Sequence, residues 1–246
     1  MQPTWQWWKL LHTIGSTYGN RQVFLTVWET VLVNQDEKIA TLPVNLDLGQ
    51  FFAAIRVRLA SASERRLTLL RQVGMDPEVM PAQIDEMVWP EEDPVDYVAR
   101  MALTKARAVW EPHVPLVLGA DTAVVCDQEI LGKPENVEHA VAMLTRLSGR
   151  WHRVLTGVAL CKADDPHGMV QVVETRVCFK SLTNQEIRSY VATKEPLDKA
   201  GAYAIQGVGA FMVARVEGSY SGVVGLPLFE TLELVRNYGL TFPETK

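Results

Sequence analysis

Four short stretches of the chain combine residue types that suit a phosphorylated ligand. The first covers residues 61–66 (SASERR). Small hydroxyl residues at the start of a helix leave backbone N–H groups free, and the helix dipole favours an anion there. Arg65 and Arg66 add forked donors that match phosphate oxygens, so we predict that they bind substrate together with Ser61 and Ser63. The alternative is a capped helix with solvated arginines.

The second stretch is residues 119–122 (GADT), within the most apolar run of the sequence, residues 116–126. A carboxylate in such a run is costly unless it is paired or bound to a metal. If Asp121 lies near a strand end, as the catalytic acids of α/β folds often do, it can hold Mg²⁺ or orient water. An Asp that caps a turn is the alternative.

The third stretch is residues 131–134 (LGKP). Gly132 and Pro134 would fix the backbone on either side of the Lys133 ammonium group. The stretch differs from a phosphate-binding P-loop because Asp127 stands where the leading glycine would be. Taken alone, it predicts only a turn that exposes a lysine.

The fourth stretch is residues 195–206 (EPLDKAGAYAIQ), which is too rich in small residues to be a good helix. It carries Asp198, Lys199, Tyr203 and Gln206. A loop that presents a ring and an amide suits recognition of the edge of a nucleobase. An ordinary surface loop fits this stretch about as well.

Composition excludes several other classes of function. A net charge of -5 and a pI near 5.6 give no general attraction to nucleic acid or to an anionic membrane. There is no apolar run of 18 residues, so no membrane span is expected. The five histidines are dispersed and form no zinc-type pair. The three cysteines fall in or beside apolar strand-like runs, so we expect reduced structural thiols in a cytoplasmic protein: Cys126, Cys161 and Cys178.

Apolar periodicity predicts alternating strands and helices from about residue 55 onward. This alternation is typical of an α/β or α+β domain of about 190 residues. The strands are expected at residues 55–60, 116–126, 154–161, 169–179 and 209–216, with a loop at 164–168. The helices are expected at residues 67–73, 94–109, 137–147, 183–192 and 226–238.

The first 52 residues stand apart, because they hold four of the seven tryptophans: Trp5, Trp7, Trp8 and Trp28. Residues 23–28 predict a strand, and no motif in the segment carries chemistry. We interpret residues 1–52 as an extension and residues 53–246 as the functional domain. The extension is interpreted either as a loosely docked, disordered or upstream-initiated segment or as a partner-binding segment that uses exposed tryptophans.

The order and spacing of the motifs resemble the Maf family of nucleotide pyrophosphatases. The resemblance covers about residues 55–240, and nine weak pieces in the right order make it specific. These pieces are residues 61–66, 85–86, 102–106, 119–122, 132–134, 147–149, 198–203, 205–206 and 224–227.

The resemblance implies a fold, a reaction and partners. The fold would be an α/β Maf fold with a mixed, twisted sheet and a cleft between two lobes. The substrate would be a nucleoside triphosphate, hydrolysed to the monophosphate and pyrophosphate with the help of a divalent metal, Mg²⁺ or Mn²⁺. Neither nucleic acid nor membrane is an expected partner. Maf-like proteins are often dimeric, so the resemblance also implies a homodimer.

The resemblance further assigns roles to single residues. The catalytic aspartate of the family matches Asp121, and its acidic metal-side residue matches Glu86. The cationic residues of the family that serve phosphate binding and catalysis match Arg65, Arg66, Lys105 and Lys133.

Base choice in the family is linked to positions that match Arg65, Thr122 and Gln206, and this combination resembles the branch that acts on dTTP and UTP. The 7-methyl-GTP branch, an alternative, has Trp and Glu in place of the first arginine and the glutamine. One departure is Glu64, where the family usually has Pro, because it brings a negative charge beside the phosphate site. A nucleotide-binding regulator of septum formation with little catalysis is the second alternative.

Overall fold

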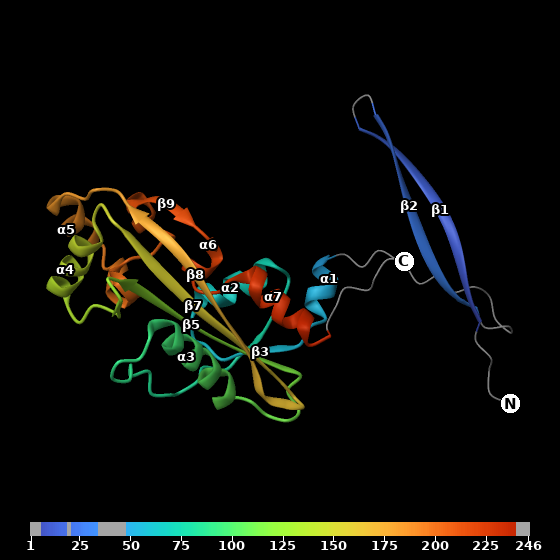
Figure 1. Ribbon diagram of the computed structural model, residues 1–246, viewed down its shortest axis with the longest axis horizontal. Coiled ribbons are helices and arrows are strands. Elements are labelled where there is room, and N and C mark those ends of the chain that lie inside the picture. Colours follow the sequence, from blue (N-terminus) through green and yellow to red (C-terminus); the bar gives the residue numbers. More distant parts are fainter. Residues whose placement is uncertain (1–5, 19–20, 34–47, 240–246) are drawn as a thin grey trace. The chain divides into compact units, whose positions relative to one another are not determined.

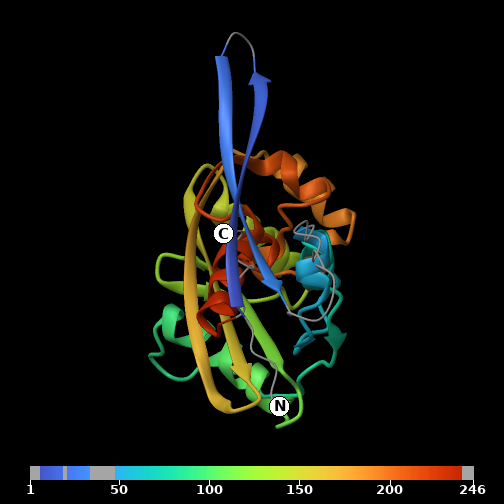
Figure 2. The same ribbon diagram turned by 90° about the vertical axis from the view of Figure 1, so that its right-hand side faces the viewer.

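The computed structural model describes residues 6–18, 21–33 and 48–239, which belong to two compact units that meet in sequence at Phe51 and Phe52 (Figure 1). The first unit contains an antiparallel hairpin of β1 (Gln6–Tyr18) and β2 (Arg21–Val33). Figure 2 shows the twist of this two-stranded ribbon.

The hairpin has an unbroken register that runs from Gln6 opposite Val33 to Tyr18 opposite Arg21. The strand predicted at residues 23–28 lies within β2 and is confirmed. Of the early tryptophans, Trp5 lies outside the described residues. The role of the segment as an extension stays a prediction.

The second unit is built on a mixed sheet of seven strands in the order β4-β3-β5-β7-β8-β9, with β6 also paired to β5. β3 runs parallel to β4 and β5, and the remaining neighbours are antiparallel. The strands are β3 (Val57–Leu59), β4 (Glu78–Val79), β5 (Leu116–Cys126), β6 (Glu129–Leu131), β7 (Trp151–Lys162), β8 (Asp165–Phe179) and β9 (Val213–Glu217). The α/β class predicted from the sequence is confirmed.

Helices and short 3-10 turns complete the chain (Figure 1). The α-helices are α1 (Leu48–Ala53), α2 (Glu64–Gln72), α3 (Pro94–Ala108), α4 (Val137–Leu147), α5 (Asn184–Ala192), α6 (Tyr220–Val224) and α7 (Leu228–Asn237). The 3-10 turns are η1 (Glu195–Asp198), η2 (Ala200–Ala202) and η3 (Val208–Met212). In the part of the chain that the structure describes, no helix is long and apolar enough to cross a bilayer.

The helix boundaries follow from capping residues that the sequence shows. The Asp93 side chain accepts a hydrogen bond from Val95 N at 2.8 Å, and Pro94 occupies the first turn of α3, as predicted. Thr183 and Glu186 form a capping box at the start of α5. These caps explain why the predicted helices begin within a few residues of their observed starts.

The centre of the sheet is apolar on both faces because helices cover it. β5 is buried at every position except Thr122, and Leu59, Leu118, Leu155 and Leu160 are almost completely excluded from solvent. A buried central strand flanked on both sides reads as a continuous apolar run rather than an alternating one. The predicted strand at residues 116–126 therefore coincides with β5.

Two predicted elements differ from the structure. The strand expected at residues 209–216 begins only at Val213, because a 3-10 turn occupies Val208–Met212 and Gly207 has φ +82°. The loop expected at residues 164–168 is mostly part of β8, which continues the hairpin with β7 through an irregular register. The sequence did not reveal the short elements β4, β6 and α6.

Candidate active site

A gap along one edge of β5 creates the main cleft of the second unit. β3 pairs with β5 as far as Leu118, and β6 pairs with it from Val124 onward. Residues 119–123 of β5 therefore have no strand on that side. A cleft of about 780 Å³ lies there, and its lining includes every site residue predicted from the sequence: Ser61, Ser63, Arg65, Arg66, Glu86, Lys105, Asp121, Thr122, Lys133 and Gln206.

Two glycines let α3 approach the sheet at this gap. A Cβ atom on Gly119 would lie 2.1 Å from the carbonyl oxygen of Ala102, and one on Gly157 would lie 2.2 Å from that of Val98. Asp121 is opposite Gly157 and two residues after Gly119, so its side chain shares the face that α3 covers. The close packing brings Lys105 of α3 to this aspartate.

Lys105 joins two carboxylates at the floor of the cleft. Its Nζ lies 2.7 Å from Asp121 Oδ1 and 2.9 Å from Glu86 Oε1. The Lys105 and Asp121 side chains are each 9% exposed, whereas Glu86 is 53% exposed. Asp121 lies in the middle of β5 rather than near its end. It reaches the cleft because β3 stops short of it.

Tyr97 holds the backbone that carries Glu86. Its hydroxyl group donates a hydrogen bond to the carbonyl oxygen of Glu86 at 3.1 Å. Burial, together with the negative charges of Asp121 and Glu86, raises the pKa of the Tyr97 hydroxyl group, so it stays a neutral donor. Tyr97 could not be singled out from the sequence, because its role depends on a loop that precedes α3.

Arg66 is fixed by contacts with three separate segments. Its guanidinium donates to Ser61 Oγ at 3.0 Å, to Thr122 Oγ1 at 3.3 Å and to the carbonyl oxygen of Gly225 at 2.8 Å. Burial lowers the pKa of Arg66, but an arginine still carries its charge. None of the three acceptors is an acid, and Arg66 forms no ion pair with another residue that the structure describes.

Thr122 faces the side of the sheet opposite to Asp121, as alternation along β5 requires. Its hydroxyl oxygen lies 3.1 Å from that of Thr156, which donates to the carbonyl oxygen of Gly222 at 2.8 Å. Gly222 belongs to α6, so this helix and α3 lie on opposite faces of the sheet (Figure 1). Asp121 and Thr122, which are adjacent on β5, therefore connect the cleft to the helices on both faces of the sheet.

Both serines of the 61–66 stretch brace the loop before α2. Ser61 Oγ accepts from Ser63 N at 3.2 Å as well as from Arg66, and Ser63 caps the helix by accepting from Arg66 N at 3.5 Å. Glu64 is exposed and Arg65 is half-buried. Neither the Arg65 side chain nor that of Lys133 forms an ion pair or hydrogen bond with another described residue.

The other wall of the cleft comes from the turn after β6 and the loop at residues 195–206. Lys133 and Gln206 are both exposed, and the two segments are linked by a hydrogen bond from Gly201 N to the carbonyl oxygen of Gly132 at 3.0 Å. Lys199 also lines the cleft and contacts Asp198. The pattern of the loop was visible in the sequence, but its link to the turn was not.

Two residues close to these motifs, one charged and one aromatic, have partners outside the cleft. Arg58 is buried and pairs with Glu78 and Glu111 at 3.0 and 3.1 Å, so it does not add to the positive charge of the cleft. The ring of Tyr203 is 5% exposed, and its hydroxyl group lies 2.8 Å from Nε2 of His152. The ring therefore anchors the loop instead of being offered freely to a base.

The donor set of the cleft fits a divalent cation that binds together with phosphate. No group of three or more His, Cys, Asp or Glu side chains able to hold a metal occurs within the described ranges. Mg²⁺ is commonly held by one or two carboxylates and completed by water and substrate phosphates. Asp121 and Glu86 supply two carboxylates that converge on a single ammonium group, which matches that requirement.

Comparisons with known proteins agree with this geometry. Residues 56–238 match the family of Maf-like proteins. The chain is 48% identical to a dTTP/UTP pyrophosphatase of Methylobacillus flagellatus over 194 residues, which are 78% of this chain and 96% of that protein. The corresponding enzyme of Geobacter sp. is 51% identical over 74% of this chain and 94% of its own length.

A third relative, the dTTP/UTP pyrophosphatase of Anaeromyxobacter sp., is 54% identical over 193 residues, 77% of this chain and 93% of that protein. The match spans nearly all of each relative, and the family match at residues 56–238 includes the cleft residues. The mixed sheet, the cleft and the extent of these matches lead to one conclusion: the chain belongs to the Maf family.

Proposed function

We propose that the protein is a nucleoside triphosphate pyrophosphatase that hydrolyses dTTP and UTP to the monophosphate and pyrophosphate. Three relatives about 50% identical to the chain carry the name dTTP/UTP pyrophosphatase. The observation that carries the proposal is the combination in one cleft of a buried Asp121–Lys105 pair and cations without acidic partners. We propose residues 53–246 as the catalytic domain and residues 1–52 as an extension.

The cations suit a ligand with about four negative charges, because a triphosphate must be neutralised before it can be cleaved. Arg65, Arg66 and Lys133 line the cleft without an ion-pair partner among the described residues. We assign them to the phosphates. Arg66 is held in place before substrate arrives, so its contribution requires little reorganisation.

The reaction breaks the bond between the α-phosphorus and the oxygen that bridges to the β-phosphate. A water oxygen forms the new bond to the α-phosphorus, and pyrophosphate leaves. Asp121 Oδ1 accepts a hydrogen bond from Lys105. The second carboxylate oxygen of Asp121 accepts none from the residues that the structure describes. We assign that oxygen either to accept the proton of the attacking water or to hold the metal.

Asp121 and Glu86 are the proposed ligands of Mg²⁺ or Mn²⁺. When bound, such a cation neutralises charge on the phosphate oxygens. Lys105 keeps both carboxylates together at the floor of the cleft before the ligand arrives. Removal of divalent cations with a chelator is expected to abolish pyrophosphate release, and addition of Mg²⁺ or Mn²⁺ is expected to restore it.

Base choice is assigned to Arg65, Thr122 and Gln206, all of which line the cleft. The exposed amide of Gln206 can both donate and accept hydrogen bonds, as the edge of a pyrimidine requires. We further propose a cytoplasmic location, which the free thiols and the nucleotide substrate favour, and a homodimeric assembly.

A pyrophosphate-release assay on a panel of nucleotides tests the function. The panel contains dTTP, UTP, CTP, dGTP and 7-methyl-GTP, each with Mg²⁺ or Mn²⁺, and the Asp121→Asn variant serves as the control for contaminating activity. We expect dTTP and UTP to be the preferred substrates. Binding of nucleotide without turnover would contradict the proposal and favour a regulator, and preference for 7-methyl-GTP would place the chain in that branch.

A further inference from the structure

We infer that Glu195 and Tyr190 are positioning residues that fasten the loop at residues 195–209 and thereby hold Gln206 toward the nucleobase. This inference deepens the proposed function and rests on it. Neither residue lines the cleft, so both would act through the loop rather than by touching substrate.

The Glu195 carboxylate connects the two ends of the loop. It accepts hydrogen bonds from Val208 N and Gly209 N, both at 3.0 Å, and a third from the Tyr190 hydroxyl group at 2.9 Å. Two of these donors are backbone groups 13 and 14 residues further along the chain. A single side chain therefore closes the segment into a ring, and Gln206 lies inside it.

Tyr190 fastens the same segment from within. Its side chain is 1% exposed, and its hydroxyl group accepts a hydrogen bond from Ala204 N at 3.2 Å while it donates to Glu195. The backbone is thus fixed two residues before Gln206 by Tyr190 and two residues after it by Glu195. Burial raises the pKa of the Tyr190 hydroxyl group, which keeps it neutral and able to donate.

Two glycines make this close approach possible. Gly207 has φ +82°, and a Cβ atom there would lie 2.7 Å from Glu195 Oε2. At Gly209 a Cβ atom would lie 2.4 Å from the carbonyl oxygen of Ala204 and 2.7 Å from the Tyr190 hydroxyl oxygen. The Gly207 and Gly209 pair, which lacks the third glycine of a dinucleotide-binding motif, therefore has a structural purpose.

The charge of Glu195 fits three donors. Burial opposes ionisation of this carboxyl group, but the hydrogen bonds from Gly209, Val208 and Tyr190 outweigh it, and its pKa is lowered. Substitution of Glu195 by Gln replaces one carboxylate oxygen with an NH₂ group, which would then face an N–H or O–H donor. The Glu195→Gln variant thus removes hydrogen bonds with almost no change in volume.

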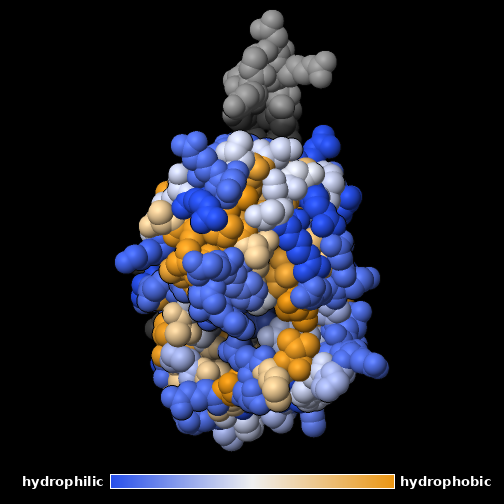
Figure 3. All heavy atoms as spheres, turned by 90° about the vertical axis from the view of Figure 1, so that its left-hand side faces the viewer, coloured by the Kyte–Doolittle hydropathy of each residue, from blue (hydrophilic) through white to orange (hydrophobic). Residues whose placement is uncertain are grey.

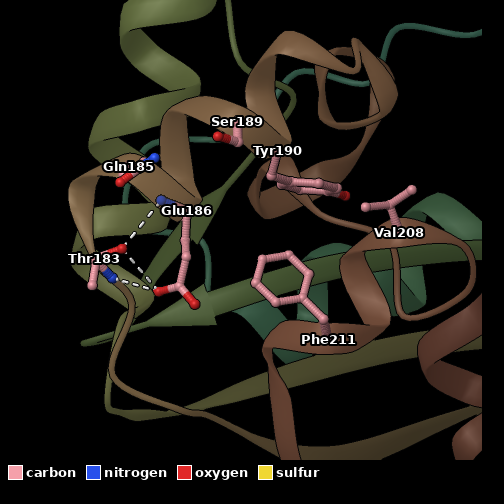
Figure 4. Close-up of a pocket in the computed structure, with 7 residues that line it drawn as sticks. All are labelled: Thr183, Gln185, Glu186, Ser189, Tyr190, Val208 and Phe211. Carbon is pink, nitrogen blue, oxygen red and sulfur yellow. Dashed lines mark hydrogen bonds between the residues drawn. The ribbon is translucent and has the colours of Figure 1, made fainter.

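The outer side of the loop gives little other support. A shallow hollow of about 360 Å³ lies there, and Figure 4 shows the Tyr190 ring, Val208 and Phe211 around it. Val208 and Phe211 are 54% and 42% exposed. Figure 3 shows hydrophobic side chains at the surface on the end of the unit that carries α4 and α5. Val208 faces solvent on this side, so the hydrogen bonds from Val208 N and Gly209 N to Glu195 are the polar contacts that hold this part of the loop.

The test compares Glu195→Gln and Tyr190→Phe with a matched control, Tyr238→Phe. Tyr238 also donates its hydroxyl hydrogen to a carboxylate, that of Asp165 at 2.8 Å, but far from the loop in sequence and outside the cleft lining. The ratio of kcat/KM for dTTP to that for dGTP is measured for each protein. We expect the two loop variants to lower this ratio by about three- to tenfold and the control to leave it within about twofold.

A second readout does not depend on activity. Hydrogen exchange of the backbone amides at Ala204, Val208 and Gly209 is expected to be slow in the wild type and faster in Glu195→Gln, but unchanged in Tyr238→Phe. Equal exchange in wild type and Glu195→Gln would overturn the fastening of the loop. Faster exchange with an unchanged dTTP to dGTP ratio would overturn its role in base choice.

The two readouts separate this inference from the proposed function. Wild-type protein that hydrolyses neither dTTP nor UTP would contradict the proposed function, and the inferred role in base choice would fall with it. The exchange measurement would still decide whether Glu195 fastens the loop.

Discussion

The two walls of the cleft differ in how their polar side chains are held. On the wall formed by α2, α3 and β5, the side chains of Arg66, Lys105 and Asp121 are buried and hydrogen-bonded. On the wall formed by the turn after β6 and the loop at residues 195–206, Lys133 and Gln206 are exposed and have no side-chain partner among the described residues.

This difference suggests a division of labour between the walls. Buried charges that are held before substrate arrives suit a transition state, because they need little reorganisation when charge develops. The amide of Gln206 on a fastened loop suits selection of the base, because it can donate and accept hydrogen bonds at the edge of the base. Variants on each wall test this division of labour.

The largest effect is expected for Asp121→Asn on the buried wall. The amide oxygen can still accept from Lys105, so the fold should persist, but the carboxylate that prepares water or holds the metal is lost. We expect kcat/KM for dTTP to fall by about 10²- to 10⁴-fold. Steady-state kinetics and a thermal melt measure the two quantities. Activity close to that of the wild type would remove Asp121 from the chemistry.

His152, which contacts Tyr203 of the loop, gives the free energy of unfolding a pH dependence. Burial lowers the pKa of His152 from 6.5 to about 4. As the pH falls below 6.5 the unfolded chain binds a proton that the folded chain does not, so the stabilisation present above pH 6.5 is lost toward pH 4. We expect the free energy of unfolding to fall by about 2 kcal/mol more in wild type than in His152→Phe between pH 7.5 and pH 5.

Urea unfolding at the two pH values measures this difference. His113→Gln is the control, because the side chain of His113 is 78% exposed. A fall in stability that is equal in wild type and His152→Phe would show that His152 is not held neutral under the loop.

The contrast between the walls also decides what could be predicted from sequence. Asp121 was found because a carboxylate in a valine-rich run is locally conspicuous, and the 61–66 stretch because serine and arginine are adjacent. The ion pairs of Arg58 could not be predicted from the sequence, because its partners Glu78 and Glu111 are remote in sequence. Burial of Tyr203 depends in the same way on His152, 51 residues away.

A smaller effect is expected on the loop wall. Gln206→Ala removes an exposed amide without disturbing the core. We expect the ratio of kcat/KM for dTTP to that for dGTP to fall by about tenfold, because a well-placed base contact contributes about 1–3 kcal/mol to discrimination. The melting temperature should stay near that of the wild type. An unchanged ratio would assign base choice elsewhere in the cleft.

The smallest effect is expected at Glu64, which occupies the position of the usual family proline. Its side chain is exposed, so solvent screens its charge from the phosphate site. We expect Glu64→Gln to change KM for dTTP by less than about threefold. A tenfold decrease in KM would show instead that Glu64, which lines the cleft, repels the triphosphate.

One comparison of two variants tests the division of labour most directly. The kcat/KM values for dTTP and dGTP are measured for wild type, Asp121→Asn and Gln206→Ala under the same conditions. Asp121→Asn is expected to lower both values by the same factor and so leave their ratio unchanged, whereas Gln206→Ala is expected to change the ratio. A changed ratio in Asp121→Asn, or an equal loss for both nucleotides in Gln206→Ala, would contradict the account.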